Sequence, residues 1–252
     1  MSRKVLIAGN WKMNCNACEA RKLILSMKSE LEALHNKADI VICPPFTSLE
    51  SVYYALGQGS TISLGAQNLY FQTNGAYTGE ISAEMIKEFC SYVIVGHSER
   101  RTLLGENNYD VKLKIQAALD SNLKIILCVG EDLTTRNNGT AAAYVENQLK
   151  ESVQNIDSIK NIIIAYEPIW AIGSGLAASA KDAQEMASFI RRVLNDLYGK
   201  EAHNTRILYG GSVKCENIGQ FLQNEDIDGA LVGSASLQAH SFTDIVQEAV
   251  KQ

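Results

Sequence analysis

Apolar residues follow two alternating patterns along the chain. Short consecutive runs, such as Ile162 to Ala165, are typical of strands that are buried on both faces. Between these runs, apolar residues recur every three or four positions, which indicates amphipathic helices. One such series is Leu23, Ile24, Met27 and Leu31.

Every predicted strand is followed by a predicted helix. The strands are expected at Val5 to Ala8, Ile40 to Cys43, Ile62 to Ala66, Tyr92 to Val95, Lys124 to Val129, Ile162 to Ala165, Arg206 to Tyr209 and Ala230 to Val232. The helices are expected at Ala17 to Leu34, Thr47 to Leu56, Ser82 to Phe89, Val111 to Ala118, Val145 to Val153, Met186 to Leu197, shortly after Val213, and at Phe242 to Ala249.

Buried strands that alternate with helices imply a parallel sheet. Eight such units in about 250 residues match a closed (β/α)8 barrel in number and size. An open doubly wound sheet is the alternative, but no G-x-G-x-x-G motif follows the first predicted strand. No linker or change of composition divides the chain. We therefore predict one α/β domain over residues 1–252, a closed parallel (β/α)8 barrel.

The composition is that of an ordinary soluble protein, with 46% hydrophobic and 20% charged residues. A net charge of −5 disfavours nucleic acid and anionic membranes as partners, because both attract basic surfaces. The chain has no signal-peptide pattern and no run of the roughly 20 apolar residues that a membrane span needs. We expect a cytoplasmic protein whose six cysteines are reduced.

Cys15 and Cys18 form a C-x-x-C pair, which can mark a redox or zinc site. No second pair exists, and the four histidines are scattered along the sequence. The pair instead opens an amphipathic helix. We predict neither a metal site nor a cofactor.

In a parallel barrel, the C-terminal ends of all strands lie on one rim, where ligands bind. The first predicted strand is followed by Asn10 and Lys12, the fourth by His97 and the sixth by Glu167. Lys12 could stabilise negative charge on a reacting oxygen. A neutral imidazole at His97 could donate a hydrogen bond to a carbonyl oxygen, and Glu167 is a candidate general base. His97 or Glu167 alone could equally be structural, whereas the position of Lys12 on the rim, one residue past Trp11, argues against an ordinary solvated lysine.

Glycine and serine residues follow the seventh and eighth predicted strands, as Gly210-Gly211-Ser212 and Gly233-Ser234. Barrels commonly bind phosphate there, through backbone N–H groups. Either pair alone could be a tight turn. The stretch after Glu167, from Pro168 to Ala178, mixes large apolar and small residues, which is typical of a lid that excludes water. Gly173 within that stretch could supply a third phosphate donor.

A carboxylate, an imidazole, a lysine, a phosphate site and a lid together suit proton abstraction next to a carbonyl group. The residues therefore indicate an aldose–ketose isomerase, or a related enolising enzyme, for a small phosphorylated substrate. Two alternatives are another phosphate-binding barrel isomerase, acting on a pentose or an anthranilate derivative, and a catalytically silent binding module. The second would be favoured by loss of Glu167, His97 or Lys12, and all three are present.

The sequence closely resembles the triosephosphate isomerase family over its whole length, which implies the TIM barrel fold. The matching stretches are Gly9 to Asn14, Gly65 to Asn68, Tyr77 to Ser82, Val95 to Arg101, Cys128 to Glu131, Ala165 to Gly173 and Tyr209 to Val213.

The resemblance implies interconversion of dihydroxyacetone phosphate and D-glyceraldehyde 3-phosphate through an enediolate, in glycolysis and gluconeogenesis, without a cofactor. Glu167 would move the proton between the two carbons, and His97 would polarise the carbonyl. Lys12, with Asn10 beside it and Glu99 behind it, would stabilise the enediolate. The phosphate would bind Gly173, Ser212, Gly233 and Ser234, and Ile172 and Leu231 would cover Glu167 on lid closure.

The resemblance also implies a homodimer in which the loop of residues 72–79 inserts into the partner subunit. Cys15 would lie at that interface. Two positions depart from the family. Ser234 stands where the family usually has a glycine, and a left-handed backbone there would be strained. Leu176-Ala177-Ala178 replaces the family's common Lys-Thr-Ala at the far end of the lid.

Overall fold

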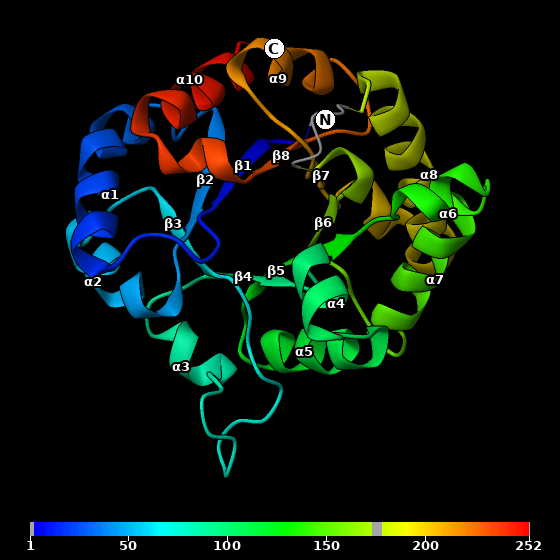
Figure 1. Ribbon diagram of the computed structural model, residues 1–252, viewed down its shortest axis with the longest axis horizontal. Helices are drawn as coiled ribbons and strands as arrows, with labels where there is room; N and C mark the ends of the chain where they lie inside the picture. The colour runs from blue at the N-terminus through cyan, green and yellow to red at the C-terminus, as the bar shows by residue number, and fades with distance from the viewer. Residues whose placement is uncertain (1–2, 173–177, 252) are drawn as a thin grey trace.

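The structure of the protein is a computed structural model that describes residues 3–172 and 178–251. Its strands form one closed parallel barrel in which each strand pairs with its neighbours in sequence and β8 pairs with β1 (Figure 1). The predicted fold class is confirmed. The strands are β1 Val5–Asn10, β2 Ala38–Cys43, β3 Ser63–Ala66, β4 Tyr92–Val95, β5 Lys124–Val129, β6 Ile162–Tyr166, β7 Ile207–Tyr209 and β8 Gly229–Val232.

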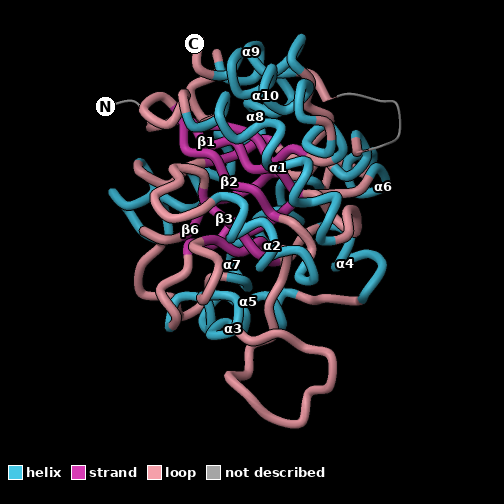
Figure 2. Tube along the Cα trace, turned by 90° about the vertical axis from the view of Figure 1, so that its left-hand side faces the viewer, coloured by secondary structure: helices cyan, strands magenta, loops and turns pink. Residues whose placement is uncertain are grey.

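Helices surround the barrel on its outside, as both the axial and the side view show (Figures 1 and 2). The α-helices are α1 Ala17–Glu32, α2 Phe46–Leu56, α3 Ala83–Lys87, α4 Ser98–Leu104, α5 Asn108–Asp120, α6 Leu133–Asn137, α7 Ala141–Ser152, α8 Ala180–Tyr198, α9 Cys215–Leu222 and α10 Ala239–Ala249. The 3-10 helices are η1 Ile169–Ala171, η2 Gly199–His203 and η3 Ser234–Leu237. None of the helices in the described part of the chain is long and apolar enough to cross a bilayer.

The predicted strands are all present, and the ends of β4 and β5 are as expected. β1 continues past Ala8 because Gly9 and Asn10 still pair with β2. The sequence pattern did not predict α4 and α6 as helices. α4 has no buried apolar stripe to reveal it, since Leu103 and Leu104 on its last turn are exposed.

Two apolar cores lie on opposite sides of the strands. The inner core contains strand residues alone and fills the barrel, whereas the outer core joins strands to helices. Side chains of a strand alternate between the two sides. Leu6 and Ala8 face inward, so Asn10 does too, and Ala165 likewise places Glu167 inward. The alternation therefore aims both polar side chains into the C-terminal mouth of the barrel.

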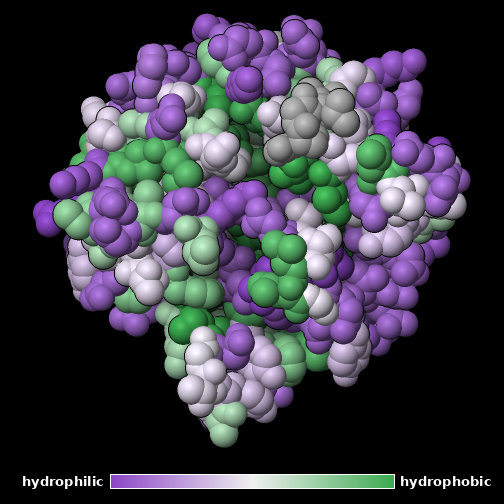
Figure 3. All heavy atoms as spheres, in the orientation of Figure 1, coloured by the Kyte–Doolittle hydropathy of each residue, from purple (hydrophilic) through white to green (hydrophobic). Residues whose placement is uncertain are grey.

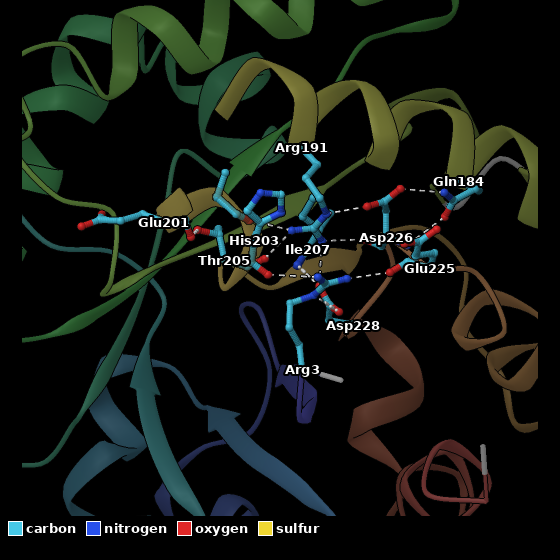
Figure 4. Close-up of polar contacts among 11 residues, drawn as sticks. Arg3, Gln184, Arg191, Glu201, His203, Thr205, Ile207, Glu225, Asp226 and Asp228 are labelled. Atoms are coloured by element: carbon cyan, nitrogen blue, oxygen red, sulfur yellow. Dashed lines mark hydrogen bonds and ion pairs between the residues drawn. The ribbon is translucent and has the colours of Figure 1, made fainter. Parts of the chain in front are cut away.

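A network of ion pairs between partly buried arginines and buried aspartates closes the opposite, N-terminal end of the barrel (Figure 4). Arg191 of α8 contacts Asp226 at 2.5 Å and Asp228 at 3.2 Å, and Arg3 contacts Asp228 at 2.5 Å. The same Asp228 carboxylate accepts a hydrogen bond from the N–H of Ile207 at 2.8 Å. The network thus ties α8 and the chain before β1 to the starts of β7 and β8.

Replacing Arg191 with methionine should lower the free energy of unfolding by about 3–5 kcal/mol, because the buried Asp226 loses its ion pair and Asp228 keeps only Arg3. Calorimetric unfolding of the two proteins measures the difference. The matched control is Lys181→Met on the same helix, whose 3.9 Å ion pair with Glu185 is exposed and should contribute little. Equal unfolding midpoints for the wild type and the Arg191 variant would contradict the expectation.

Candidate active site

A cavity of about 230 Å³ opens at the C-terminal end of the barrel. Hydrophilic side chains gather at the centre of this face (Figure 3). The cavity brings together every predicted site residue within the described part of the chain, whereas Gly173 lies outside the described residues. The predicted residues that line it are Asn10, Lys12, His97, Glu167, Ser212, Gly233 and Ser234, with Ile172 and Leu231 also on its wall.

Lys12 is held in a left-handed backbone conformation, with φ of 52°. Its N–H donates to Asn10 Oδ1 at 3.0 Å, and its carbonyl accepts from Gln67 Nε2 at 2.8 Å. Its ammonium group contacts Glu99 Oε1 at 2.5 Å and lies 3.9 Å from where a Cβ would stand on Gly233. Such a backbone costs about 1–3 kcal/mol and persists because its surroundings fix it. The cation is thus set between Glu99 and the end of β8.

His97 is the residue that caps α4. Its Nδ1 accepts the N–H of Glu99 at 3.3 Å, so the ring proton is on Nε2. Nε2 lies 3.0 Å from Glu167 Oε1, inside the cavity. The helix cap therefore orients the imidazole as a neutral N–H donor aimed at the place where a ligand would bind.

Glu167 is almost completely buried, with 2% of its surface exposed. Its Oε2 accepts the N–H of Ser98 at 2.8 Å, and its Oε1 accepts the Ser98 hydroxyl at 3.1 Å. Both donors belong to the first residue of α4, where the helix dipole favours a negative charge. In this arrangement the carboxylate is docked on the first turn of α4.

Two glycines make room for Glu167. A Cβ on Gly130 would stand 1.8 Å from the Glu167 carbonyl oxygen. A Cβ on Gly210 would stand 2.9 Å from Glu167 Cγ. Side chains at these positions would occupy space that the Glu167 backbone and side chain now fill.

The ends of β7 and β8 carry backbone N–H groups with no partner in residues 3–172 and 178–251. They belong to Ser212, Gly233 and Ser234, all on the cavity wall. Grouped amides of this kind can bind an anion. Ser234 does not have the left-handed backbone that would be strained, since the non-glycine residues described with positive φ are Lys12, Cys15, Asn122 and Asn155.

The near end of the predicted lid is anchored by Glu131, which is completely buried. Its Oε1 accepts from Trp170 Nε1 at 2.9 Å and from the Tyr166 hydroxyl at 3.1 Å. Arg136 stacks over the Trp170 ring at 4.5 Å. At the far end, Ala178 is buried, whereas Leu176 and Ala177 lie outside the described residues.

Sequence reasoning missed Ser98 and Glu131 as site residues. Ser98 could have been found from its position as the first residue of a helix next to a strand end, where N–H groups lack partners. Glu131 gave no such signal, because its partners come from distant parts of the sequence. Within the described ranges, no group of three His, Cys, Asp or Glu side chains is arranged to hold a metal ion.

The closed barrel and the groups on its rim define the chain as a (β/α)8-barrel isomerase. The family model described as triosephosphate isomerase matches residues 5–249. The chain belongs to the triosephosphate isomerase family, as the sequence motifs indicated.

Individual relatives agree over nearly the full length. The triosephosphate isomerase of Dehalococcoides mccartyi (strain CBDB1) is 52% identical over 98% of this chain and 97% of that protein. The triosephosphate isomerase of Thermoanaerobacter pseudethanolicus is 48% identical over 97% of this chain and 99% of that protein. The crystal structure of triosephosphate isomerase from Bartonella henselae superposes with a TM-score of 0.89 at 38% identity, covering 97% of this chain and 98% of that one.

The proton of the neutral His97 ring should be found on Nε2, because Nδ1 is occupied as an acceptor. Long-range ¹H–¹⁵N spectra of the imidazole groups identify the tautomer, and His97→Gln assigns its signals among the four histidines. A His97 ring protonated on Nδ1 alone would contradict the geometry.

Proposed function

We propose that the chain is a triose-phosphate isomerase that interconverts dihydroxyacetone phosphate and D-glyceraldehyde 3-phosphate. The observation that carries the proposal is the 3.0 Å contact between His97 Nε2 and Glu167 Oε1, at the wall of a cavity that Lys12 also lines. The proposed enzyme is a single domain over residues 1–252, works without metal or cofactor in glycolysis and gluconeogenesis, and is cytoplasmic.

Glu167 is the proposed base. After leaving Ser98, its carboxylate removes a proton from the carbon next to the substrate carbonyl and returns it to the neighbouring carbon. The Nε2–H of His97 donates to the carbonyl oxygen, on which negative charge develops. The Lys12 ammonium, with Asn10 beside it, stabilises the same charge. Both groups are positioned before the substrate arrives, by the contacts with the Glu99 N–H and carboxylate.

The phosphate is proposed to bind the N–H groups of Ser212, Gly233 and Ser234. These groups have no other partner in the described chain, and the Lys12 cation stands beside Gly233. Gly173, outside the described residues, is proposed as a further donor from the lid. The phosphate would then hold the reacting carbons between Glu167 and His97, which is the positioning that such catalysis requires.

Glu167→Asp and His97→Gln should each lower kcat for glyceraldehyde 3-phosphate by about 10²–10⁴-fold, because each removes a positioned proton-transfer group. A coupled assay of dihydroxyacetone phosphate formation measures the rates. Glu185→Asp, on the exposed surface of α8, is the control and should match the wild type. A wild-type rate no higher than that of the two site variants would refute the assignment.

We further propose a homodimer formed through the loop of residues 72–79. This loop projects from the barrel beyond α3 (Figures 1 and 2), and its residues are exposed. The rings of Tyr77 and Tyr70 pack against each other at a tilt of 45°, with their centroids 4.8 Å apart, which gives the projecting loop a defined shape. Met13 is 95% exposed and Met85 54%. An ordered, projecting loop suits insertion into a second copy, and exposed apolar side chains outside the loop, such as those of Met13 and Met85, suit burial against that copy.

Alkylating Cys15 with a bulky reagent should split the dimer and abolish activity, because the modified thiol would not fit at the proposed interface. Burial, and then the charge of Glu19, raises the pKa of this thiol, so its alkylation rate should still be rising above pH 9. Sedimentation and activity assays give the readouts. Cys15→Ala, which keeps the exposed Cys18, should resist the reagent. An intact, active dimer after complete modification of Cys15 would disprove the hypothesis.

A further inference from the structure

The pairing of β4 with β5 ends before the rim of the barrel. Its last pair is Val95 with Leu127. The next two residues, Gly96 and Cys128, are bridged by Arg101 of α4 instead. Its Nε donates to the Gly96 carbonyl at 2.7 Å and its Nη2 donates to the Cys128 carbonyl at 3.3 Å. A guanidinium group thus joins the two strands where the backbone ladder has stopped.

The bridged carbonyls lie next to the supports of the two proposed reacting groups. Gly96 directly precedes His97. Cys128 directly precedes Val129, whose carbonyl accepts the N–H of Glu167 at 2.8 Å. A change in the distance between Gly96 and Cys128 should therefore also shift the His97 imidazole and the Glu167 carboxylate relative to each other.

The Gly96 peptide is fixed from both sides. Its N–H donates to Glu106 Oε1 at 3.1 Å, and its carbonyl is held by Arg101. Its φ of 71° favours glycine, and a Cβ there would stand 2.8 Å from Arg101 Nη2. The guanidinium therefore lies directly against backbone that carries no side chain.

Arg101 makes no ion pair with a carboxylate in the part of the chain that the structure describes. Its remaining side-chain contact is neutral, from Nη1 to Asn108 Oδ1 at 2.6 Å. Burial lowers the pKa of this guanidinium. A partly buried guanidinium without a direct ion pair is costly, although the more distant charges of Glu106 and Glu167 favour its charged form. Its planar fork can bridge two carbonyl groups in a way that lysine cannot.

We propose that Arg101 is a positioning residue that sets the separation of His97 and Glu167 by extending the β4–β5 pairing to the rim. The inference rests on the proposed isomerase function. Arg101 does not touch the substrate. It acts through the Gly96 and Cys128 carbonyls, so its loss should affect the chemical step more than phosphate binding.

The test compares Arg101→Met, which removes the bridge, and Arg101→Lys, which keeps a charge but not the fork. Asn108→Ala is the control, since it releases the outer contact and leaves both carbonyl contacts in place. Each protein is assayed for kcat and KM, for inhibition by 2-phosphoglycolate and inorganic phosphate, and for the ¹⁵N signals of the His97 ring. 2-Phosphoglycolate carries a carboxylate where the enediolate carries its oxygens, whereas phosphate reports on the anion site alone.

For Arg101→Met we expect kcat to fall about 100-fold with KM nearly unchanged, because small misplacement of reacting groups costs about this much. 2-Phosphoglycolate should bind more weakly and phosphate equally well. Arg101→Lys should recover only part of the rate, and Asn108→Ala should match the wild type. If Arg101→Met does not fold, the kcat and the inhibitor binding of Arg101→Lys test the proposal instead.

Equal losses of phosphate and 2-phosphoglycolate binding would overturn the proposal, since they indicate general damage to the site. Full activity in Arg101→Lys would overturn it too, because the charge alone would then suffice. An inactive wild type would instead refute the proposed function. In that event the His97 signals still decide on Arg101: a changed tautomer or broadened ring signal in Arg101→Met supports positioning, and an unchanged spectrum opposes it.

Discussion

The contact between His97 and Glu167 is the interaction on which the rest of the site depends. The two residues follow β4 and β6, and β5 runs between these strands. They meet because Gly130 directly follows β5, at a point where no side chain fits beside the Glu167 backbone, and because Gly210 leaves room for the Glu167 side chain. The alternation of side chains along the strands directs Glu167 into the barrel mouth, and glycine at positions 130 and 210 lets its side chain approach His97.

The two ends of the barrel use polar groups in opposite ways. At the N-terminal end, Arg191 and Arg3 are paired with Asp226 and Asp228, and the charges satisfy one another. At the C-terminal end, amides such as that of Gly233 are unpaired among the described residues. Unpaired polar groups cost stability unless a ligand or water satisfies them. The network at the base stabilises the barrel, whereas the rim keeps its groups for binding.

The sequence predicted those features that depend on local pattern. Buried runs located the strands, and the ends of the strands located Asn10, Lys12, His97 and Glu167. Features that depend on distant contacts were not predictable. Ser98 holds Glu167 across 69 residues of sequence, and α4 carries exposed leucines rather than a buried stripe. The backbone angle of Ser234 was also not predictable, because backbone angles follow from the surrounding fold and not from residue type alone.

In the proposed mechanism, the docking of Glu167 on α4 couples substrate binding to the placement of the base. Two donors hold the carboxylate, the Ser98 N–H and the Ser98 hydroxyl, and His97 Nε2 lies 3.0 Å from it. Hydrogen bonds to a charged group contribute about 1.5–3 kcal/mol each. In the proposed mechanism a substrate must take over the His97 donor and offset the loss of Ser98. A phosphate bound at the ends of β7 and β8 can supply that free energy, because its contacts are remote from the reacting carbons.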